Sequence, residues 1–317
     1  MTTTRVLAVL ALSCLINSSP AANGQDPAAP SAPGRLLEIQ AVALDRDGTP
    51  VNDLRPTDLE VWIAGFRVPI ESLLVAPPAA QDAPGRLIVL LMDDITLDPV
   101  IVARARDVAN RFVAGLRPND RMGVVMLNGG PMELTSAPAR LSAQIDRFRQ
   151  SLGALPVDQL GVQLLTRVTG IAGAISEAPE RRKIIVAIGS AWLLDTPVLP
   201  GETGGARNLR QEWFDAMRAL GAADATYYVI DPVGVGRSRQ TGSNGLAREA
   251  GGYAFTNTND LKGPADRILR EADSYYVIRV ADPPAGRKAL VREVDVRSLR
   301  RDLTVRARRG IPGGGGK

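Results

Sequence analysis

The sequence predicts an α/β fold, a doubly wound and mostly parallel sheet with small β-rich elements flanking it. The segment Arg86–Pro99, RLIVLLMDDITLDP, is an apolar run that stops at two carboxylates, which is typical of a central strand covered by helices on both faces. From residue 85 to about 283, strand patterns and helix patterns alternate. Beyond that point, β-branched runs with alternating charge follow one another without helices, which indicates antiparallel strands exposed on one face.

Residues 1–25 have the features of a signal peptide. A basic residue, Arg5, precedes an apolar core from Val6 to Ile16, and small residues follow, with cleavage expected after Ala21 or near Gly24. The core is too short to span a bilayer, and we expect no transmembrane segment later in the chain. The sequence therefore predicts an exported protein of the periplasm, the cell surface or the extracellular medium.

Composition divides the rest of the chain. Residues 26–34 are a flexible leader rich in Pro and Ala, 35–76 a small β-rich unit, and 77–85 a linker. Residues 86–282 form the α/β domain, and 283–317 are a β tail with a flexible Gly-rich end.

Each element follows from its local pattern. Short runs rich in β-branched residues predict strands, and apolar residues at helical spacing, such as Val108, Phe112 and Leu116, predict helices. Besides the central strand, the predicted strands are Arg35–Ala43, Arg121–Leu127, Met132–Thr135, Lys183–Ile188, Thr226–Ile230, Tyr253–Phe255, Tyr275–Val280, Ala289–Val296 and Leu303–Ala307. The predicted helices are Pro99–Leu116, Ala139–Leu152, Gly161–Ser176, Asn208–Gly221, Leu246–Gly251 and Leu261–Ala272.

Composition excludes several kinds of chemistry. The 317 residues contain no histidine, which removes Ser-His-Asp and Cys-His catalysis and every zinc site built on imidazole. The one cysteine, Cys14, lies inside the signal segment, where a lipoprotein signal is the weaker alternative to ordinary cleavage. The net charge of +4 is small, and we interpret the arginines between residues 287 and 309 as solvated faces of strands, so no nucleic-acid partner is expected.

Acidic and hydroxyl side chains follow the central strand directly. They are Asp93, Asp94, Thr96 and Asp98. Ligands of open α/β sheets bind at the carboxyl ends of the strands, so these residues are candidates for recognition or chemistry. In the alternative interpretation, Asp93 and Asp94 only cap and polarise the N-terminus of the following helix.

Six stretches of the chain share the pattern of one bacterial family. They are LEIQAVALDRDGTPVNDLRPTDLEVWIAG, LIVLLMDD, ALGAADATYYVIDPVG, AREAGGYAFTNTNDL, SYYVIRV and DLTVRARRG. In this order they resemble a von Willebrand factor A (VWFA) domain, and more narrowly the exported VWFA-related acidobacterial proteins. The resemblance spans nearly the whole mature chain and implies a Rossmann-like fold and a binding module.

The resemblance also implies where a metal ion would bind. Many such domains have a metal-ion-dependent adhesion site, with Asp-x-Ser-x-Ser in a first loop, a Thr in a second and an Asp in a third. Counted from Asp93, Ile95 and Leu97 stand at the two hydroxyl positions, and neither can ligate. In the third loop Gly189 and Ser190 replace the expected acid, so the resemblance implies a degenerate site.

A frame shifted by one residue keeps a metal-binding alternative open. The loop then supplies Asp94, Thr96 and Asp98, and Thr135 fits the second loop. Hard oxygen ligands of this kind suit Mg²⁺, Mn²⁺ or Ca²⁺, although no cofactor is certain. The candidate metal-site residues are therefore Asp93, Asp94, Thr96, Asp98, Thr135 and Ser190.

An enzyme is the rival hypothesis. A phosphatase of the haloacid dehalogenase type also has an acid-terminated first strand, but it needs Asp-x-Asp, and here Ile95 follows Asp93 at that spacing and Thr96 follows Asp94. We therefore predict a non-enzymatic, exported module that recognises a protein or another macromolecule through the loops at the carboxyl ends of its strands, with no catalytic residues. A divergent phosphatase-like hydrolase remains the less favoured alternative.

Overall fold

The computed structural model describes residues 36–76, 85–151, 155–195, 209–236, 245–282 and 291–312. The predicted signal peptide, the leader, the linker up to residue 84 and the Gly-rich end lie outside these ranges. None of the helices within them is long and apolar enough to cross a membrane.

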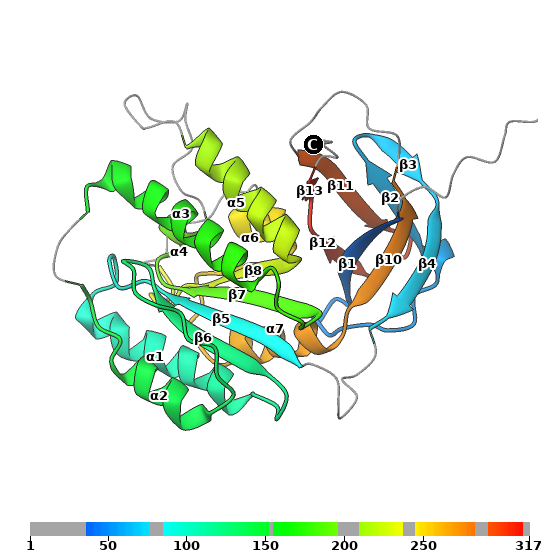
Figure 1. The fold of residues 1–317 in the computed structure, drawn as a ribbon. Coiled ribbons are helices and arrows are strands. Elements are labelled where there is room, and N and C mark those ends of the chain that lie inside the picture. Colours follow the sequence, from blue (N-terminus) through cyan, green and yellow to red (C-terminus); the bar gives the residue numbers. More distant parts are fainter. Residues whose placement is uncertain are drawn as a thin grey trace, which may run out of the picture. The chain divides into compact units, whose positions relative to one another are not determined.

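A parallel sheet of five strands forms the centre of the α/β domain (Figure 1). The strand predicted to be central, β5 (Arg86–Met92), is buried along its whole length, which confirms that prediction. The strand order is β6 (Arg121–Met126), β5, β7 (Arg182–Ile188), β8 (Ala225–Ile230) and β9 (Ala254–Phe255). The chain reverses its direction of winding between β5 and β7, so the carboxyl ends of these two strands mark the topological switch point.

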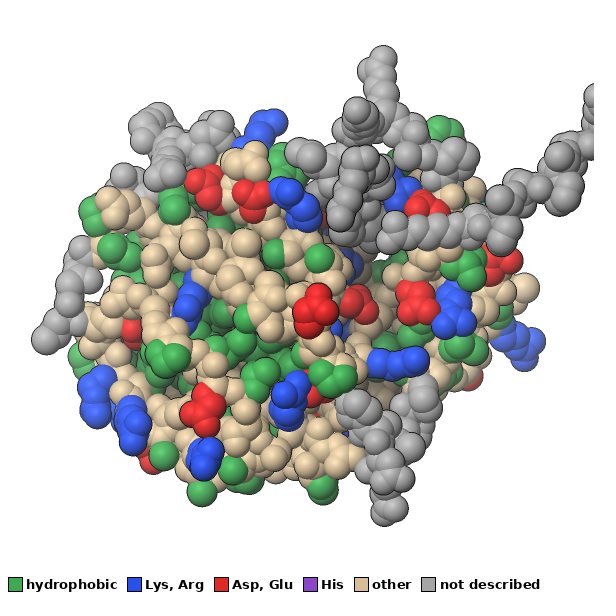
Figure 2. Space-filling view, viewed as in Figure 1, with side chains coloured by type: hydrophobic (Ala, Val, Ile, Leu, Met, Phe, Trp, Pro, Cys, Tyr) green, Lys and Arg blue, Asp and Glu red, His purple; other side chains and the backbone are tan. Residues whose placement is uncertain are grey.

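Helices cover both faces of this sheet, because alternate residues of β5 point to opposite sides. On one face Ile88 and Leu90 pack against three helices, α1 (Pro99–Ala114), α2 (Pro138–Asp146) and α7 (Gly263–Asp273). On the other face Leu87 and Val89 belong to the core formed with α3 (Val157–Ile175), α4 (Ala191–Leu194), α5 (Arg210–Ala223) and α6 (Leu246–Glu249). Figure 2 shows hydrophobic side chains between α2 and α3, with charged side chains of both signs scattered around them.

The β-rich segments from the two ends of the chain share two antiparallel sheets. One sheet has the order β12-β1-β10-β4 and the other β13-β11-β2-β3. A common core that includes Ile39, Val61, Tyr276 and Val294 draws on both sheets. The strands are β1 (Leu36–Leu44), β2 (Leu59–Ile63), β3 (Phe66–Val68), β4 (Ile70–Val75), β10 (Tyr276–Ala281), β11 (Val291–Ser298), β12 (Thr304–Ala307) and β13 (Gly310–Pro312).

The structure differs from the sequence prediction in a few elements. The strand β10, which the predicted boundary at residue 282 places in the α/β domain, pairs instead with β1 and β4. The predicted strand Met132–Thr135 is reduced to one antiparallel bridge between Thr135 and Met122. The predicted helix Ala139–Leu152 ends at Asp146, and α4 and β13 had no predicted counterpart.

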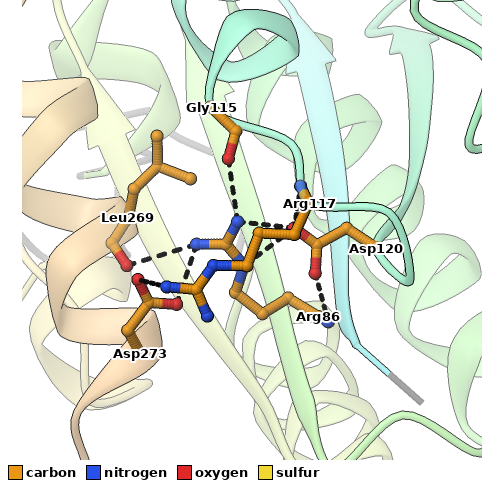
Figure 3. Close-up of polar contacts among 6 residues, drawn as sticks. All are labelled: Arg86, Gly115, Arg117, Asp120, Leu269 and Asp273. Atoms are coloured by element: carbon orange, nitrogen blue, oxygen red, sulfur yellow. Dashed lines mark hydrogen bonds and ion pairs between the residues drawn. The ribbon is translucent and has the colours of Figure 1, made fainter. Parts of the chain in front are cut away.

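A network of buried charges lies at the amino end of β5 (Figure 3). The Arg86 guanidinium donates to Asp120, to Asp273 at 3.0 Å and to the Gly115 carbonyl at 2.9 Å. Asp120 also accepts the backbone N–H of Arg86 at 2.7 Å, and Arg117 forms a second ion pair with Asp273. The network joins the start of β5, the loop between α1 and β6, and the end of α7.

Candidate functional site

The candidate site is built on the carboxyl end of β5. Its apolar run is covered on both faces, so the first residues that can turn toward the edge of the sheet are Asp93 and Asp94. Asp93 is 0% exposed, and its backbone N–H bonds to the Ile188 carbonyl at the end of β7. This places Asp93 at the switch point, between the two strands that diverge there.

The Asp93 carboxylate is the centre of a hydrogen-bonded cluster. Its Oδ1 accepts the backbone N–H groups of Ile95 at 3.1 Å and Thr96 at 2.9 Å. Its Oδ2 accepts the Thr96 hydroxyl and the backbone N–H of Ser190, the latter at 3.1 Å. The Thr96 and Ser190 hydroxyl oxygens lie 2.8 Å apart. A carboxylate has about four acceptor positions, so donors from the loops after β5 and β7 together occupy all of them.

Burial dominates the electrostatics of Asp93. Desolvation raises the pKa of this carboxyl group above its usual value, and the hydrogen bonds from Thr96, Ser190 and Ile95 oppose that shift in part. Within the described ranges, no lysine or arginine forms an ion pair with Asp93. A buried carboxylate held only by neutral donors is less stable in its charged form than one paired with a cation, and this condition is frequent at functional sites.

Asp94 faces a different pair of loops. Its Oδ1 accepts the Asn128 backbone N–H at 2.8 Å, and its Oδ2 accepts the Ser151 hydroxyl. The backbone N–H of Ser151 bonds to the Asp94 carbonyl at 2.6 Å. The charge of Asp94 also acts on Arg167, whose pKa is lowered by burial and raised in part by this carboxylate. Asp94 therefore fixes the loop after β6 and the loop between α2 and α3.

The remaining predicted ligands, Asp98 and Thr135, form no side-chain hydrogen bond with this cluster. Asp98 is exposed and precedes the first residue of α1, without a side-chain capping bond. Thr135 exchanges backbone hydrogen bonds with Met122, and Met122 pairs with Ile88 near the start of β5. At about 3.3 Å per residue, Thr135 lies level with a point roughly 16 Å from Asp93 along the strand.

The oxygens of the predicted metal-site residues lie in separate places, which bears on whether they could hold a divalent cation. Octahedral Mg²⁺ needs several oxygens that converge on one point. Asp94, Thr96, Asp98 and Thr135 do not converge, since Asp94 faces Ser151 and Thr135 lies toward the other end of the sheet. The oxygens that do come together are those of Asp93, Thr96 and Ser190, and the carboxylate among them is already saturated. No cluster of three or more metal-ligating acids is found in the part of the chain that the structure describes.

The alternative interpretation, in which Asp93 and Asp94 cap the N-terminus of the following helix, does not match the hydrogen bonds of the structure. The helix α1 begins at Pro99, after Asp98, whereas Asp93 bonds to N–H groups inside the loop that precedes it. Asp93 and Asp94 therefore organise loops, and neither carboxylate accepts a hydrogen bond from the first turn of α1.

Several residues of this edge are not among the metal-site residues predicted from the sequence. Gly189 is required because a Cβ there would lie 2.1 Å from the Asp93 Cβ. Asp231, after β8, is buried and accepts the Ala191 N–H at 3.2 Å and the Val233 N–H at 2.9 Å. The available signal was the position of Asp231 directly after an apolar run, as with Asp93. Ser151 and Asn128 carried no such signal, because they lie in loops whose path depends on tertiary packing.

No family model and no curated protein matches the sequence. Solved structures similar to this chain at low identity include the following three. A mutant of the PilB minor pilin from Streptococcus sanguinis has 11% identity and a TM-score of 0.43, with 61% of this chain and 63% of that chain covered. Proximal thread matrix protein 1 from the mussel byssus has 12% identity and a TM-score of 0.40, with 73% and 50% covered.

The third structure is a von Willebrand factor type A protein from Catenulispora acidiphila, with 11% identity, a TM-score of 0.38, and 78% of this chain and 71% of that chain covered. The chain thus spans less than two thirds of the pilin and of the byssus protein. The α/β architecture described above rests on the strand order itself, and a von Willebrand factor A domain is among the structures to which this chain is similar.

Proposed function

We propose that this chain is a non-enzymatic binding module that recognises a protein through the loops at the carboxyl ends of β5, β7 and β8. The observation that carries the proposal is the Asp93–Thr96–Ser190 cluster at the switch point, the position where ligands of doubly wound sheets bind. The cluster fixes the two loops against each other, which suits a preformed recognition surface.

The chemistry of the cluster favours binding over catalysis. A carboxylate with four internal hydrogen bonds has no acceptor left to activate a nucleophile or to attack a substrate. The chain also has no histidine to serve as a base near the two hydroxyls. We propose that the module works without a metal ion, with a degenerate adhesion site. The alternative is a cation held by Asp94, Thr96, Asp98 and Thr135.

Exposed side chains around the cluster suggest the chemistry of the partner. Val100, at the start of α1, is 81% exposed, and Val235, in the loop after β8, is 57% exposed. Arg104, one turn after Val100, donates to the Val233 carbonyl at 3.4 Å, so the first turns of α1 and the loop after β8 are neighbours. With Asp98 exposed beside them, this edge suits a partner that offers an apolar side chain next to a basic one.

The resemblance of the sequence to the VWFA-related acidobacterial group supports a further part of the proposal. We infer that the mature protein is exported, to the periplasm, the cell surface or the medium, and meets its partner there. The signal-peptide pattern in residues 1–25 supports export.

A cross-linking experiment tests the binding proposal. A photoreactive side chain at position 100 should give a discrete protein adduct in the envelope fraction of the source cell, and Thr96→Val combined with Ser190→Ala should reduce it. The matched control is position 299, an exposed leucine next to β11. Equal adducts from both positions, or no adduct from either, would refute recognition at this edge.

Two further measurements separate the alternatives. Calorimetric titration with Mg²⁺, Mn²⁺ and Ca²⁺ should give no saturable heat, and saturable heat that Asp94→Asn abolishes would establish the metal-binding alternative. Turnover of a phosphate or ester substrate that Asp93→Asn abolishes would establish the hydrolase alternative.

A further inference from the structure

A cavity of about 400 Å³ lies between the last strand of the parallel sheet and strands of the two antiparallel sheets. One wall is the segment around β9, with Tyr253, Ala254 and Thr256. The opposite wall contains residues 294–296 of β11 and 304–307 of β12. The two walls meet at one end, because a Cβ added to Gly251 would lie 2.8 Å from the Arg308 backbone nitrogen. The volume is within the range of ligand-binding sites.

The free edge of β9 lines this cavity. Among the described strands, β9 pairs only with β8. The carbonyl groups of Tyr253 and Phe255 accept backbone N–H groups from β8 and the residue after it, at 3.1 and 2.9 Å. Backbone groups of successive residues point to opposite sides of a strand, so Ala254 and Thr256 direct theirs away from β8. The cavity wall includes Ala254 and Thr256 but not Phe255, which places these outward groups at the cavity.

A second free strand edge lies in the opposite wall. The strand β13 pairs with β11 only at residues 291–293, and the next bond on that side runs from the Val294 N–H to the Arg309 carbonyl at 2.6 Å. Val296 is two residues further along β11, so its backbone groups point to the same side, beyond the end of β13. No described strand pairs with β11 there, and Val296 belongs to the cavity wall. Backbone groups without a strand partner therefore stand on both sides of the cavity.

An extended peptide is the ligand that complements such an edge. Backbone N–H and C=O groups are strong hydrogen-bonding groups, and a peptide backbone presents the opposite partner for each of them at the same spacing. Strands rise about 3.3 Å per residue, lie about 4.8 Å from their neighbours, and belong to sheets that pack about 10 Å apart, so a cavity of about 400 Å³ accommodates roughly two or three residues of an added strand. Recognition of this kind does not require a charged ligand.

The side chain of Tyr253 indicates which residues the peptide should carry. Its ring is 47% exposed, and an edge-to-face contact with Phe255 at a centroid distance of 5.0 Å holds the ring in place. The two aromatic residues are two positions apart, so they lie on the same face of the strand. A strand added to β9 would bring one of its own side chains beside Tyr253 on that face. Aromatic residues pair favourably with β-branched residues across strands, so valine, isoleucine or threonine suits this position.

We propose that this cavity binds an extended peptide segment of another protein, which adds a strand to the free edge of β9 and places a β-branched side chain against Tyr253. The site is independent of the proposed function at the carboxyl edge, because its wall contains none of Asp93, Thr96 and Ser190.

Calorimetry and ligand-observed NMR on the full mature chain test the proposal with three capped peptides. A tetrapeptide of alternating valine and threonine should bind saturably at millimolar concentration. The same peptide with every backbone nitrogen methylated loses its N–H donors and should bind at least about tenfold more weakly. A glycine tetrapeptide keeps the donors without the side chains and should also bind more weakly. Equal binding of the methylated peptide would overturn strand addition, equal binding of the glycine peptide would overturn the contact with Tyr253, and no binding of the first peptide would overturn the site.

Substitutions locate the binding. Ala254→Pro removes the outward N–H of β9 and leaves the bonds to β8 in place, because proline is tolerated where the N–H of an edge strand faces outward. It should raise the Kd of the first peptide by about three- to tenfold, whereas the matched control Ala254→Gly keeps the N–H and should change the Kd by less than about twofold.

The aromatic contact has its own pair of variants. Tyr253→Ala should raise the Kd by about two- to fivefold, and Tyr253→Phe, which keeps the ring, should restore it. Should Ala254→Pro fail to fold, Tyr253→Ala and the methylated peptide decide. Unchanged affinity in both Ala254→Pro and Tyr253→Ala, or an equal loss in Ala254→Gly and Ala254→Pro, would overturn the proposal.

Discussion

The two ends of the parallel sheet bury carboxylates in opposite ways. At the amino end, Asp120 and Asp273 share the Arg86 guanidinium, and Asp273 pairs with Arg117 as well. At the carboxyl end, Asp93 is held by backbone N–H groups and a hydroxyl, and no lysine or arginine of the described ranges forms an ion pair with it. At the amino end each carboxylate is paired with an arginine, and these ion pairs join separate elements of the fold. The arrangement at the carboxyl end keeps a charged group in an uncompensated position, which is the condition expected of a site rather than of a structural joint.

The largest effect should come from breaking the compensated end. Arg86→Met would leave two carboxylates at the base of the sheet without their shared cation, and we expect a loss of about 3–5 kcal/mol in the free energy of unfolding. Urea denaturation followed by circular dichroism measures it.

The matched control is Arg111→Met, which removes an exposed ion pair with Asp266 between α1 and α7. Its urea midpoint should stay near that of the wild type, because exposed ion pairs contribute little. Equal losses in the two variants would show that the Arg86 network is no more structural than a surface pair.

At the carboxyl end of the sheet, adding a methyl group at a close contact should change the free energy of unfolding more than the titration of Asp93 does. In Gly189→Ala the new Cβ would lie 2.1 Å from the Asp93 Cβ, so the loops after β5 and β7 must separate. We expect a destabilisation of about 1–3 kcal/mol from this overpacking.

Gly170→Ala is the matched control, because a Cβ at this position in α3 meets nothing within 4 Å. It should stabilise the protein by up to about 1 kcal/mol through helix propensity. If the two variants behaved alike, the close contact between Gly189 and Asp93 would not exist in solution.

The same comparison shows which parts of the molecule local sequence patterns can predict. The buried run of β5 and the acids that end it are visible in the sequence, because burial on both faces leaves a continuous apolar segment. The pairing of β1 with β10 is not visible, since Leu36 and Ala281 are brought together only by long-range contacts. For that reason the β-rich ends were predicted as separate units although they share two sheets.

Within the candidate site, the sequence could predict which residues follow each strand but not the directions of their side chains. Ser190 was named from its place after a strand, and the structure brings its hydroxyl to Thr96. The direction of Asp94 toward Ser151 depends on how the loop between α2 and α3 packs, which no local pattern encodes. Thr135 was assigned to the second metal-binding loop from its position along the chain. Its pairing with Met122 of β6, which places it near the amino end of the sheet, is a tertiary contact that the sequence does not reveal.

The uncompensated charge of Asp93 should appear in the pH dependence of stability. Its folded pKa is raised by burial, so on acidification the native state takes up a proton before the unfolded state does. Its contribution therefore destabilises the protein above the folded pKa, and this cost is relieved as the pH falls from the folded pKa toward the unfolded value of 3.8. The free energy of unfolding of the wild type, relative to that of Asp93→Asn, should rise over this window in urea titrations.

Asp266 should give the opposite sign. The hydrogen bond from Arg111 lowers the pKa of Asp266, so its contribution is present above the unfolded value of 3.8 and is lost as the pH falls through the folded pKa. The wild type should therefore lose stability relative to Asp266→Asn on acidification. The same sign for both aspartates would contradict the contrast between paired and unpaired carboxylates.

The smallest expected change in stability comes from substituting Thr96 and Thr135, the two threonines that the sequence analysis assigns to one metal site. Thr135 Oγ1 accepts the Ala137 N–H at 3.1 Å and forms no hydrogen bond with Asp93, so Thr135→Ala should cost about 0.5–1 kcal/mol and leave the pH dependence assigned to Asp93 unchanged. Thr96→Val removes a hydrogen bond that lowers the pKa of Asp93, so that pH dependence should move to higher pH. Urea titrations of both variants between neutral and acidic pH measure the difference. A shift caused by Thr135→Ala would mean that Thr135 reaches Asp93 in solution, and the metal-binding alternative would then regain its second loop.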